Sequence, residues 1–287
     1  MQSKSSYDCF REGSWRLWVL RDMWSEALWR EVLQQIESER PAKHPQTRRF
    51  FYASGGREFY LKIYHPSGPG GTVKDFFRNS KAVRALKQGC ALSELGFHVP
   101  LAVAAGEKRD FGILNRAFLL TSAVKGLPLP LYLEGFLGKR DRASLQQKRQ
   151  WLDRLAIEIR RMHRLGFVHG DLVPSNIVVQ AEEAQVAFFF VDNDRTRRYP
   201  AWFPQGRWRR NLVQLNRFVL PGISLQDRMR FLKTYLGKPW GRGERRFLKW
   251  LEEKTRKRRR ECDHVEAGVS FRELMRWNGP FSSNFSN

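Results

Sequence analysis

Two short stretches decide the fold of this chain, namely HGDLVPSN at residues 169–176 and VAFFFVDND at residues 186–194. The first lies between an expected helix and an expected β-hairpin, and the second is the returning strand of that hairpin. A hairpin brings its two ends together, so we expect Asn176 at its start and Asp192 at its end to face each other. An amide oxygen with one or two carboxylates forms an all-oxygen site, which suits Mg²⁺ better than a softer metal.

Two further residues extend this pattern toward phosphoryl transfer. Asp171 lies five residues before Asn176, beside the expected metal site, where a carboxylate can accept the proton of a reacting hydroxyl. Lys62 lies within FYLKIY, an apolar and aromatic run of strand type, and a lysine there can pair with the α- and β-phosphates of ATP. Taken singly, Asp171 fits a helix cap or turn equally well, and Lys62 fits an exposed strand position. In this order and together, these residues predict a kinase-like site.

The remaining elements follow from periodicity and turn residues. Two aromatic-rich runs around Gly55-Gly56 predict a hairpin, and apolar residues at three- and four-residue steps predict a long helix before Gly166. The expected elements are a hairpin of Arg48–Ser54 with Arg57–Tyr64, a helix over Lys74–Leu95, a strand over Phe118–Thr121, a hinge over Ala123–Pro130 and a helix from Leu145 to Met162.

Two features that usually accompany an ATP-binding lysine are missing. No Glu occurs between Phe76 and Ser93, where a kinase places the helix glutamate that pairs with this lysine, and Glu94 lies at the helix end. No GxGxxG precedes the hairpin, because Gly55-Gly56 is its turn. We therefore expect the phosphates to be covered by another segment, KHPQT at residues 43–47.

Composition limits the class of protein. The chain has 287 residues, of which 41% are hydrophobic, enough to build a core of one large domain or two lobes. No apolar run approaches the roughly 18 residues of a membrane span, and MQSKSSYDCFREG at the N-terminus has no apolar signal core. Three widely spaced cysteines suit reduced thiols better than disulfides or a zinc site. We expect a soluble cytoplasmic protein.

The charge of +23 is concentrated in the C-terminal third. Residues 195–260 hold 21 Lys and Arg against 4 Asp and Glu, a surplus of 17. Such a surplus predicts a polyanionic partner, which could be nucleic acid, an anionic membrane or a phosphorylated substrate. It is also compatible with a solvated helix face, and the aromatic residues interleaved there suit base stacking, a membrane contact or an ordinary core.

The motifs resemble those of the bacterial lipopolysaccharide core kinases, the Kdo/heptose kinase or InaA-type family. VHGDLVPSN and FVDNDR resemble that family's catalytic loop and metal-binding strand end, and RRFFYASGGREFYLKIY resembles its ATP-binding hairpin. NSKAVRALKQGCALSELGFHVPLAVAAGE and NLVQLNRFVLPGISLQDRMRFLKTYLG are similar to its helical segments. The resemblance implies an α+β, two-lobed protein-kinase-like fold, with a small antiparallel sheet lobe over residues 1–122 and a larger, mainly helical lobe over residues 123–287.

The resemblance also implies site roles. Lys62 would bind the phosphates of ATP and Asp171 would be the catalytic base, while Asn176 and Asp192 would ligate Mg²⁺. His169 and Asp194 would support them. A basic acceptor side follows the metal-binding strand directly, for which we expect Arg195, Arg197 and Arg198, with the Arg207–Arg210 group.

The implied acceptor is a Kdo or heptose hydroxyl of the lipopolysaccharide inner core on lipid A. The enzyme would work in the cytoplasm, attached peripherally to the anionic inner membrane of a Gram-negative bacterium, and the Arg256–Arg260 run would serve that attachment. One alternative is a protein or small-molecule kinase of the same fold, although polycationic aminoglycosides do not suit so basic an acceptor side. The other is a non-catalytic nucleic-acid-binding protein, which we do not expect because no nucleic-acid-binding motif is present.

Overall fold

A computed structural model describes residues 7–40, 45–52, 55–65, 78–139, 141–182, 185–200, 202, 206–220 and 222–266. The chain forms two compact units. The first comprises Met1–Lys125 with Phe190–Arg195, and the second comprises Gly126–Phe189 with Thr196–Asn287. The expected boundary lay at 122/123 and left residues 190–195 in the second lobe. The chain thus returns to the first unit at the DND segment.

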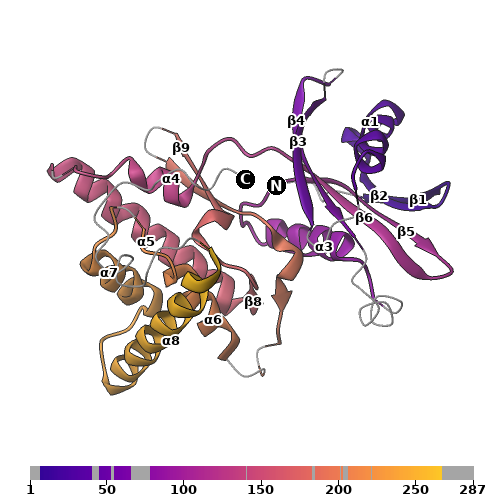
Figure 1. The fold of residues 1–287 in the computed structure, drawn as a ribbon. Coiled ribbons are helices and arrows are strands. Elements are labelled where there is room, and N and C mark those ends of the chain that lie inside the picture. The colour runs from indigo at the N-terminus through magenta and orange to yellow at the C-terminus, as the bar shows by residue number, and fades with distance from the viewer. Residues whose placement is uncertain are drawn as a thin grey trace. The chain divides into compact units, whose positions relative to one another are not determined.

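The first unit is built on an antiparallel sheet of six strands in the order β1-β2-β5-β6-β4-β3 (Figure 1). The expected hairpin is confirmed as β3 and β4, and the expected strand over 118–121 lies inside the longer β6. The strands are β1 (Tyr7–Glu12), β2 (Trp15–Leu20), β3 (Gln46–Tyr52), β4 (Arg57–Tyr64), β5 (Ala102–Asp110) and β6 (Ile113–Ser122).

The two faces of this sheet pack against different helices. On one face α1 (Glu26–Glu37) buries Leu28, Trp29 and Val32 against alternate strand residues such as Leu61 and Phe118. On the other face α3 (Lys81–Glu94) buries Ala82, Val83 and Leu86 against a cluster that includes Tyr64. Since neighbouring side chains of a strand point to opposite faces, Lys62 lies on the α3 face, between strand neighbours that point toward α1.

Helix α3 begins later than expected. Its first residue is Lys81, whereas residues 78–80 are not helical and residues 74–77 lie outside the described part of the chain. The Ser80 side chain accepts a hydrogen bond from the backbone N–H of Val83 and so caps the helix. The buried Glu107 carboxylate accepts the Ser80 backbone N–H, which holds this start against β5.

The second unit contains the long helix α5 (Arg142–Arg164), whose buried face includes Trp151, Leu155 and Ile159. The expected helix is confirmed, and it ends before Gly166, which has a φ of +84°. A Cβ at Gly166 would lie 2.3 Å from the backbone oxygen of Tyr199. Position 166 therefore requires glycine, both because its backbone is left-handed and because the backbone of Tyr199 approaches too closely to leave room for a side chain.

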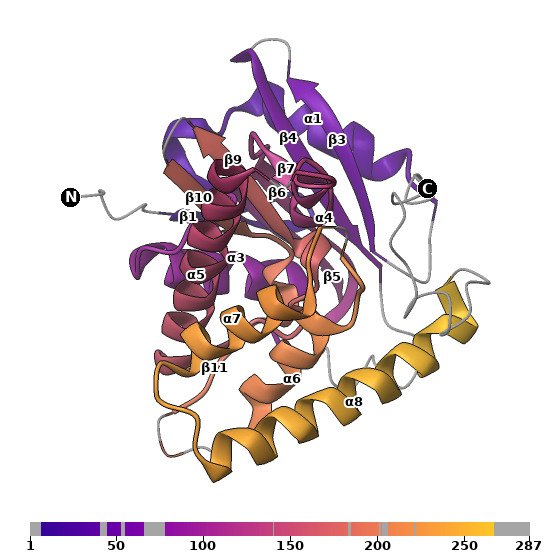
Figure 2. The same cartoon turned by 90° about the vertical axis from the view of Figure 1, so that its left-hand side faces the viewer.

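Short strands and four more α-helices complete the described part of this unit (Figure 2). The expected hinge is only partly irregular, because its second half forms β7 and the start of α4, with Leu127 paired to Val179. Two small sheets have the orders β10-β9-β7 and β11-β8. The elements are β7 (Leu127–Pro128), α4 (Leu129–Glu134), β8 (Phe167–Val168), β9 (Ile177–Glu182), β10 (Gln185–Phe190), β11 (Arg197–Arg198), α6 (Gly206–Asn216), α7 (Leu225–Leu236) and α8 (Arg242–Glu266).

Basic residues of this unit also stabilise its interior. The Arg259 guanidinium, 8% exposed, donates to the backbone oxygens of Asn216 and Arg217 at 2.7 and 2.6 Å. Arg228 donates to the backbone oxygen of Phe218 at 3.2 Å. These cations satisfy carbonyls at the C-terminal end of α6, where the helix dipole favours positive charge. Arg259 is thus a structural residue within the basic run that was expected to serve membrane attachment.

A buried ion pair joins α5 to α7. The Lys148 ammonium lies 2.8 Å from the Asp227 carboxylate and 3.0 Å from the Gly222 backbone oxygen, and both side chains are under one tenth exposed. Asp227 also accepts the Ser224 backbone N–H and hydroxyl in a capping box. Burial alone would raise the pKa of this carboxyl, but the Lys148 and Ser224 donors outweigh it and lower the pKa.

Replacing Lys148 by Met should destabilise the protein by about 3 kcal/mol, because a buried carboxylate loses its counter-ion while the α5 packing is kept. Urea unfolding measures this change. The matched control is Lys233→Met on α7, an exposed lysine, which should change stability by under about 0.5 kcal/mol. Equal effects of the two substitutions would contradict the structural role of the pair.

None of the helices in the described ranges is long and apolar enough to cross a membrane.

Candidate functional site

Lys62 occupies an interior position of the first unit's sheet. Its strand β4 lies between β3 and β6, where Lys62 is opposite Thr47 and Leu119. The flanking residues Leu61 and Ile63 are fully buried on the other face. The Lys62 side chain is 17% exposed, and its ammonium lies 5.4 Å from the centre of the Tyr64 ring. The buried neighbours Leu61 and Ile63 fix the strand in the sheet, and this holds the Lys62 side chain on the face that packs against α3.

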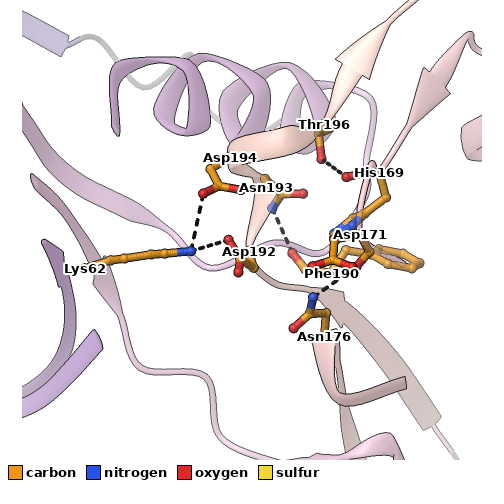
Figure 3. A network of polar contacts seen from close by, with 9 residues as sticks. All are labelled: Lys62, His169, Asp171, Asn176, Phe190, Asp192, Asn193, Asp194 and Thr196. Atoms are coloured by element: carbon orange, nitrogen blue, oxygen red, sulfur yellow. Dashed lines mark hydrogen bonds and ion pairs between the residues drawn. The ribbon is translucent and has the colours of Figure 1, made fainter. Parts of the chain in front are cut away.

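The DND segment presents two carboxylates to this lysine. The Lys62 ammonium lies 2.5 Å from Asp192 Oδ1 and 3.5 Å from Asp194 Oδ2 (Figure 3). Asp192 adopts a φ of +62°, and the buried Asn193 side chain donates to the Phe190 backbone oxygen at 2.9 Å. This local turn points both Asp side chains to the same side. Asp192 and Asp194 thus pair with Lys62 in a chain without the usual helix glutamate.

The electrostatics of this cluster suit a cation. Burial and the neighbouring negative charge of Asp192 raise the pKa of the Asp194 carboxyl, while the Lys62 ammonium opposes that shift. The Lys62 ammonium faces both carboxylates, and the positive charge of Arg195 also acts on Asp194. Carboxylate oxygens are the ligands that Mg²⁺ prefers. Among the described residues no group of three or more His, Cys, Asp or Glu could hold a metal ion; the expected ligand set combines carboxylates with the Asn176 amide.

The HGD loop of the second unit holds Asp171 and Asn176. The backbone N–H of Val173 donates to the Asp171 backbone oxygen at 2.9 Å, and the Asn176 N–H donates to the Val173 oxygen at 3.0 Å. The Asn176 side-chain NH₂ donates to the same Asp171 oxygen at 3.0 Å (Figure 3). This contact uses the amide nitrogen of Asn176, and the amide oxygen takes no part in it.

His169 is fully buried, and its backbone is anchored on both sides. Its N–H donates to Asn211 Oδ1 at 3.0 Å, and its carbonyl oxygen accepts from the Thr196 hydroxyl at 3.1 Å. The second contact ties the loop to the chain directly after the DND segment. The supporting role expected of His169 stays a prediction.

Two amide side chains of α6 hold the loop, and sequence reasoning missed both. Gln214 Oε1 accepts the Leu172 N–H at 3.2 Å, while its NH₂ donates to the Gly170 backbone oxygen at 2.9 Å and lies 3.5 Å from Asp171 Oδ1. Asn211 donates to Gln214 at 2.9 Å. The sequence signal was available as NLVQ, two amides one helical turn apart on an otherwise basic helix.

His163 extends the same network into the α5–α7 interface. Its Nε2 lies 3.1 Å from Asn211 Oδ1 and its Nδ1 lies 2.8 Å from the Tyr235 hydroxyl. Burial lowers the pKa of His163 to about 4, so the ring is neutral at pH 7. Asn211 Oδ1 can only accept, so Nε2 carries the proton and Nδ1 accepts from Tyr235. This buried network fixes the position of α6 under the loop.

The expected acceptor-side arginines are exposed. Arg195 ends a short 3₁₀ turn of the first unit, while Arg197 and Arg198 form β11 and pair with Val168 and Phe167. Arg198 lies 5.4 Å from the centre of the Phe167 ring. The expected phosphate cover at residues 43–47 falls partly outside the described residues, and its last two residues begin β3.

Replacing Gln214 by Met should loosen the loop, because the Leu172 N–H and the Gly170 carbonyl lose their partners. We expect the Leu172 amide to exchange its hydrogen at least about tenfold faster, for loss of about 1.4 kcal/mol of protection. Site-resolved hydrogen exchange measures this rate. The matched control Gln214→Glu keeps an acceptor for Leu172 and should preserve slow exchange there; fast exchange in both variants would contradict the assignment.

The comparisons with known proteins concern the family and the fold of the chain. The model of the lipopolysaccharide kinase (Kdo/WaaP) family matches residues 27–235, whereas no curated protein sequence matches the chain. Among solved structures, one described as WaaP in complex with acyl carrier protein has a TM-score of 0.59 and 21% sequence identity, covering 78% of this chain and 91% of that chain. That likeness confirms the expected α+β, protein-kinase-like fold.

The family match spans the strand lysine, the HGD loop, the DND segment and the two amides of α6 that hold the loop. It covers well over half of the chain, and it confirms the resemblance that the motifs predicted. The chain therefore belongs to the lipopolysaccharide kinase (Kdo/WaaP) family and is a phosphotransferase of that kind.

Proposed function

We propose that this protein transfers the γ-phosphoryl group of ATP, with Mg²⁺, to a hydroxyl of Kdo or heptose in the lipopolysaccharide inner core. The observation that carries the proposal is the pairing of Lys62 with Asp192 and Asp194 in a member of this family. A strand lysine and a strand-end aspartate are the two groups that a kinase uses on ATP phosphates and on their metal ion.

Lys62 and Asp192 would exchange partners when nucleotide binds. With Mg-ATP present, the Lys62 ammonium would bind phosphate oxygens, and the Asp192 carboxylate would become a metal ligand with the Asn176 amide oxygen. Mg²⁺ would neutralise the charge of the phosphates. Asp194, more buried than Asp192, would keep Lys62 in place during that exchange.

Asp171 would be the catalytic base. The acceptor hydroxyl oxygen attacks the γ-phosphorus, the bond to the bridging oxygen of the β-phosphate breaks, and ADP leaves with that electron pair. The hydroxyl proton passes to the Asp171 carboxylate. Gln214 holds the backbone on both sides of Asp171, so the carboxylate is positioned by the loop and needs no partner on the acceptor side.

The acceptor is anionic, and the chain offers it a basic surface. Arg195, Arg197 and Arg198 follow the DND segment directly and are exposed. We propose that they contact the phosphates and carboxylates of the lipid A–inner core acceptor, because the guanidinium group can donate two hydrogen bonds to two oxygens of one such anion. The enzyme would act in the cytoplasm at the inner membrane, held there by exposed basic residues of α8.

Replacing Asp171 by Asn should lower kcat by about 100- to 10,000-fold, because the proton loses its acceptor, while Mg-ATP affinity is kept. Transfer of labelled γ-phosphate to purified Kdo-lipid A and to its heptosylated form measures this, with aminoglycosides as a third acceptor class. The matched control is Glu182→Gln, an exposed carboxylate of the same unit. No transfer to either lipid by a folded protein that binds Mg-ATP would overturn the acceptor assignment, and full activity of Asp171→Asn would overturn the base.

Removing charge from α8 should weaken membrane attachment. Each exposed basic residue near an anionic surface contributes about 1 kcal/mol, so the triple variant Arg245→Gln, Arg246→Gln, Lys249→Gln should bind anionic vesicles about 100-fold more weakly. Vesicle sedimentation measures the affinity. The control carries Arg245→Lys, Arg246→Lys and Lys249→Arg, which keep the charge; binding that does not distinguish the two triple variants would contradict attachment through α8.

A further inference from the structure

The second unit contains a basic pocket away from the residues assigned to ATP, Mg²⁺ and proton transfer. It has a volume of about 970 Å³. Its walls are the end of α5, the backbone around Gly166, the β8–β11 pair, the first turn of α6 and the end of α7. All of these segments belong to one compact unit.

Of the described residues, five cations and no acidic residue line this pocket. They are Arg160, Arg164, Arg198, Arg207 and Lys238. Lys238 is paired with Glu244 at 2.5 Å. Within the described ranges, no ion pair joins Arg160, Arg164 or Arg198 to a carboxylate. Like charges gathered in a concave site repel one another and focus a positive potential, which an anionic ligand would relieve.

The pocket's charge does not depend on histidine. His163 lies in its wall, but burial lowers the His163 pKa to about 4, and the ring is used by Asn211 and Tyr235. The positive charge of the pocket comes from four arginines and one lysine.

Aromatic residues shape the same walls. Tyr199, Trp208 and Tyr235 line the pocket, and the Arg207 guanidinium lies 5.1 Å from the centre of the Tyr199 ring while donating to its hydroxyl at 3.2 Å. The Arg160 guanidinium packs directly against Gly237: a Cβ atom at position 237 would lie only 1.7 Å from the Arg160 guanidinium. Arginine side chains held by such packing lose less freedom on binding.

We propose that this pocket binds a ligand through phosphate groups. Guanidinium groups match phosphate oxygens bidentately, and aromatic walls suit a ring attached to the phosphate. The ligand is either a free phosphorylated molecule or a phosphorylated lipid headgroup, since both offer the same chemistry. Arg198 belongs both to this pocket and to the basic surface proposed for the acceptor, so the inference rests in part on the proposed function and adds a defined phosphate-binding pocket to it; binding here can be measured without nucleotide or transfer.

The test uses the full chain without ATP or Mg²⁺ and measures pyrophosphate binding by calorimetry. Every variant carries Lys62→Met, which removes the other lysine expected to bind phosphates. The pocket variant adds Arg160→Gln and Arg164→Gln. The matched control adds Arg149→Gln and Arg154→Gln, two exposed arginines of the same helix that do not line the pocket. The two variants therefore lose the same charge from the same helix.

We expect the pocket variant to bind pyrophosphate at least about tenfold more weakly than the control, since charge-assisted hydrogen bonds are lost. A second arm uses vesicles with phosphatidic acid, which exposes a phosphomonoester, against vesicles of equal charge with phosphatidylglycerol. If the control variant binds phosphatidic acid vesicles more tightly than phosphatidylglycerol vesicles and the pocket variant does not, the ligand is a lipid headgroup.

Equal binding by the two variants in both arms would overturn the proposal. Circular dichroism and a thermal melt check folding. If the pocket variant does not fold, Arg164→Gln alone, at an exposed position of α5, replaces it and is compared with Arg149→Gln; the same tenfold criterion then decides.

Discussion

The backbone of the HGD loop depends on amide side chains from a single helix. Buried N–H and C=O groups need partners, and Asn211 and Gln214 supply them for His169, Gly170 and Leu172. The same Asn211 oxygen accepts from His163, which Tyr235 holds in turn. Helix α6 is fixed at its far end by Arg228 and Arg259. The contacts of Asn211 and Gln214 hold the loop directly, and the others hold α6, the helix that carries these two side chains.

Lys62 shows how a kinase-like chain can dispense with the helix glutamate. The glutamate's physical task is to hold a flexible cation near the nucleotide phosphates. Here Asp192 and Asp194 face the lysine directly, so in the proposed mechanism the strand-end carboxylates would take over that task. The lysine's partner would then also be the proposed metal ligand, and nucleotide binding and metal binding would be coupled. A cation that enters the cluster would release Lys62 for the phosphates.

The excess positive charge has several separate uses. Lys148, Arg228 and Arg259 are bound inside the second unit, where they satisfy a carboxylate and helix-end carbonyls. Other cations line a pocket in which no described lining residue is acidic, although Lys238 among them pairs with Glu244. Others are exposed, as on α8, whose length is clear in Figure 2. The net charge therefore overstates the positive charge that can contact an anionic surface, because some of the cations are buried and bound to groups inside the protein.

Spacing along the chain was enough to predict the strand hairpin, the long α5 helix and the catalytic motifs, because these depend on local periodicity and on turn residues. The same local patterns placed the start of α3 too early, because the Ser80 cap fixes that start. They also assigned β7 to a hinge, because its strand character depends on pairing with β9. Lys62 could be selected from sequence as a lone cation in an apolar strand, but its partners could not. Residues 62 and 192, or 170 and 214, are brought together only by tertiary packing, and no periodicity of the chain encodes a hydrogen bond between two distant elements.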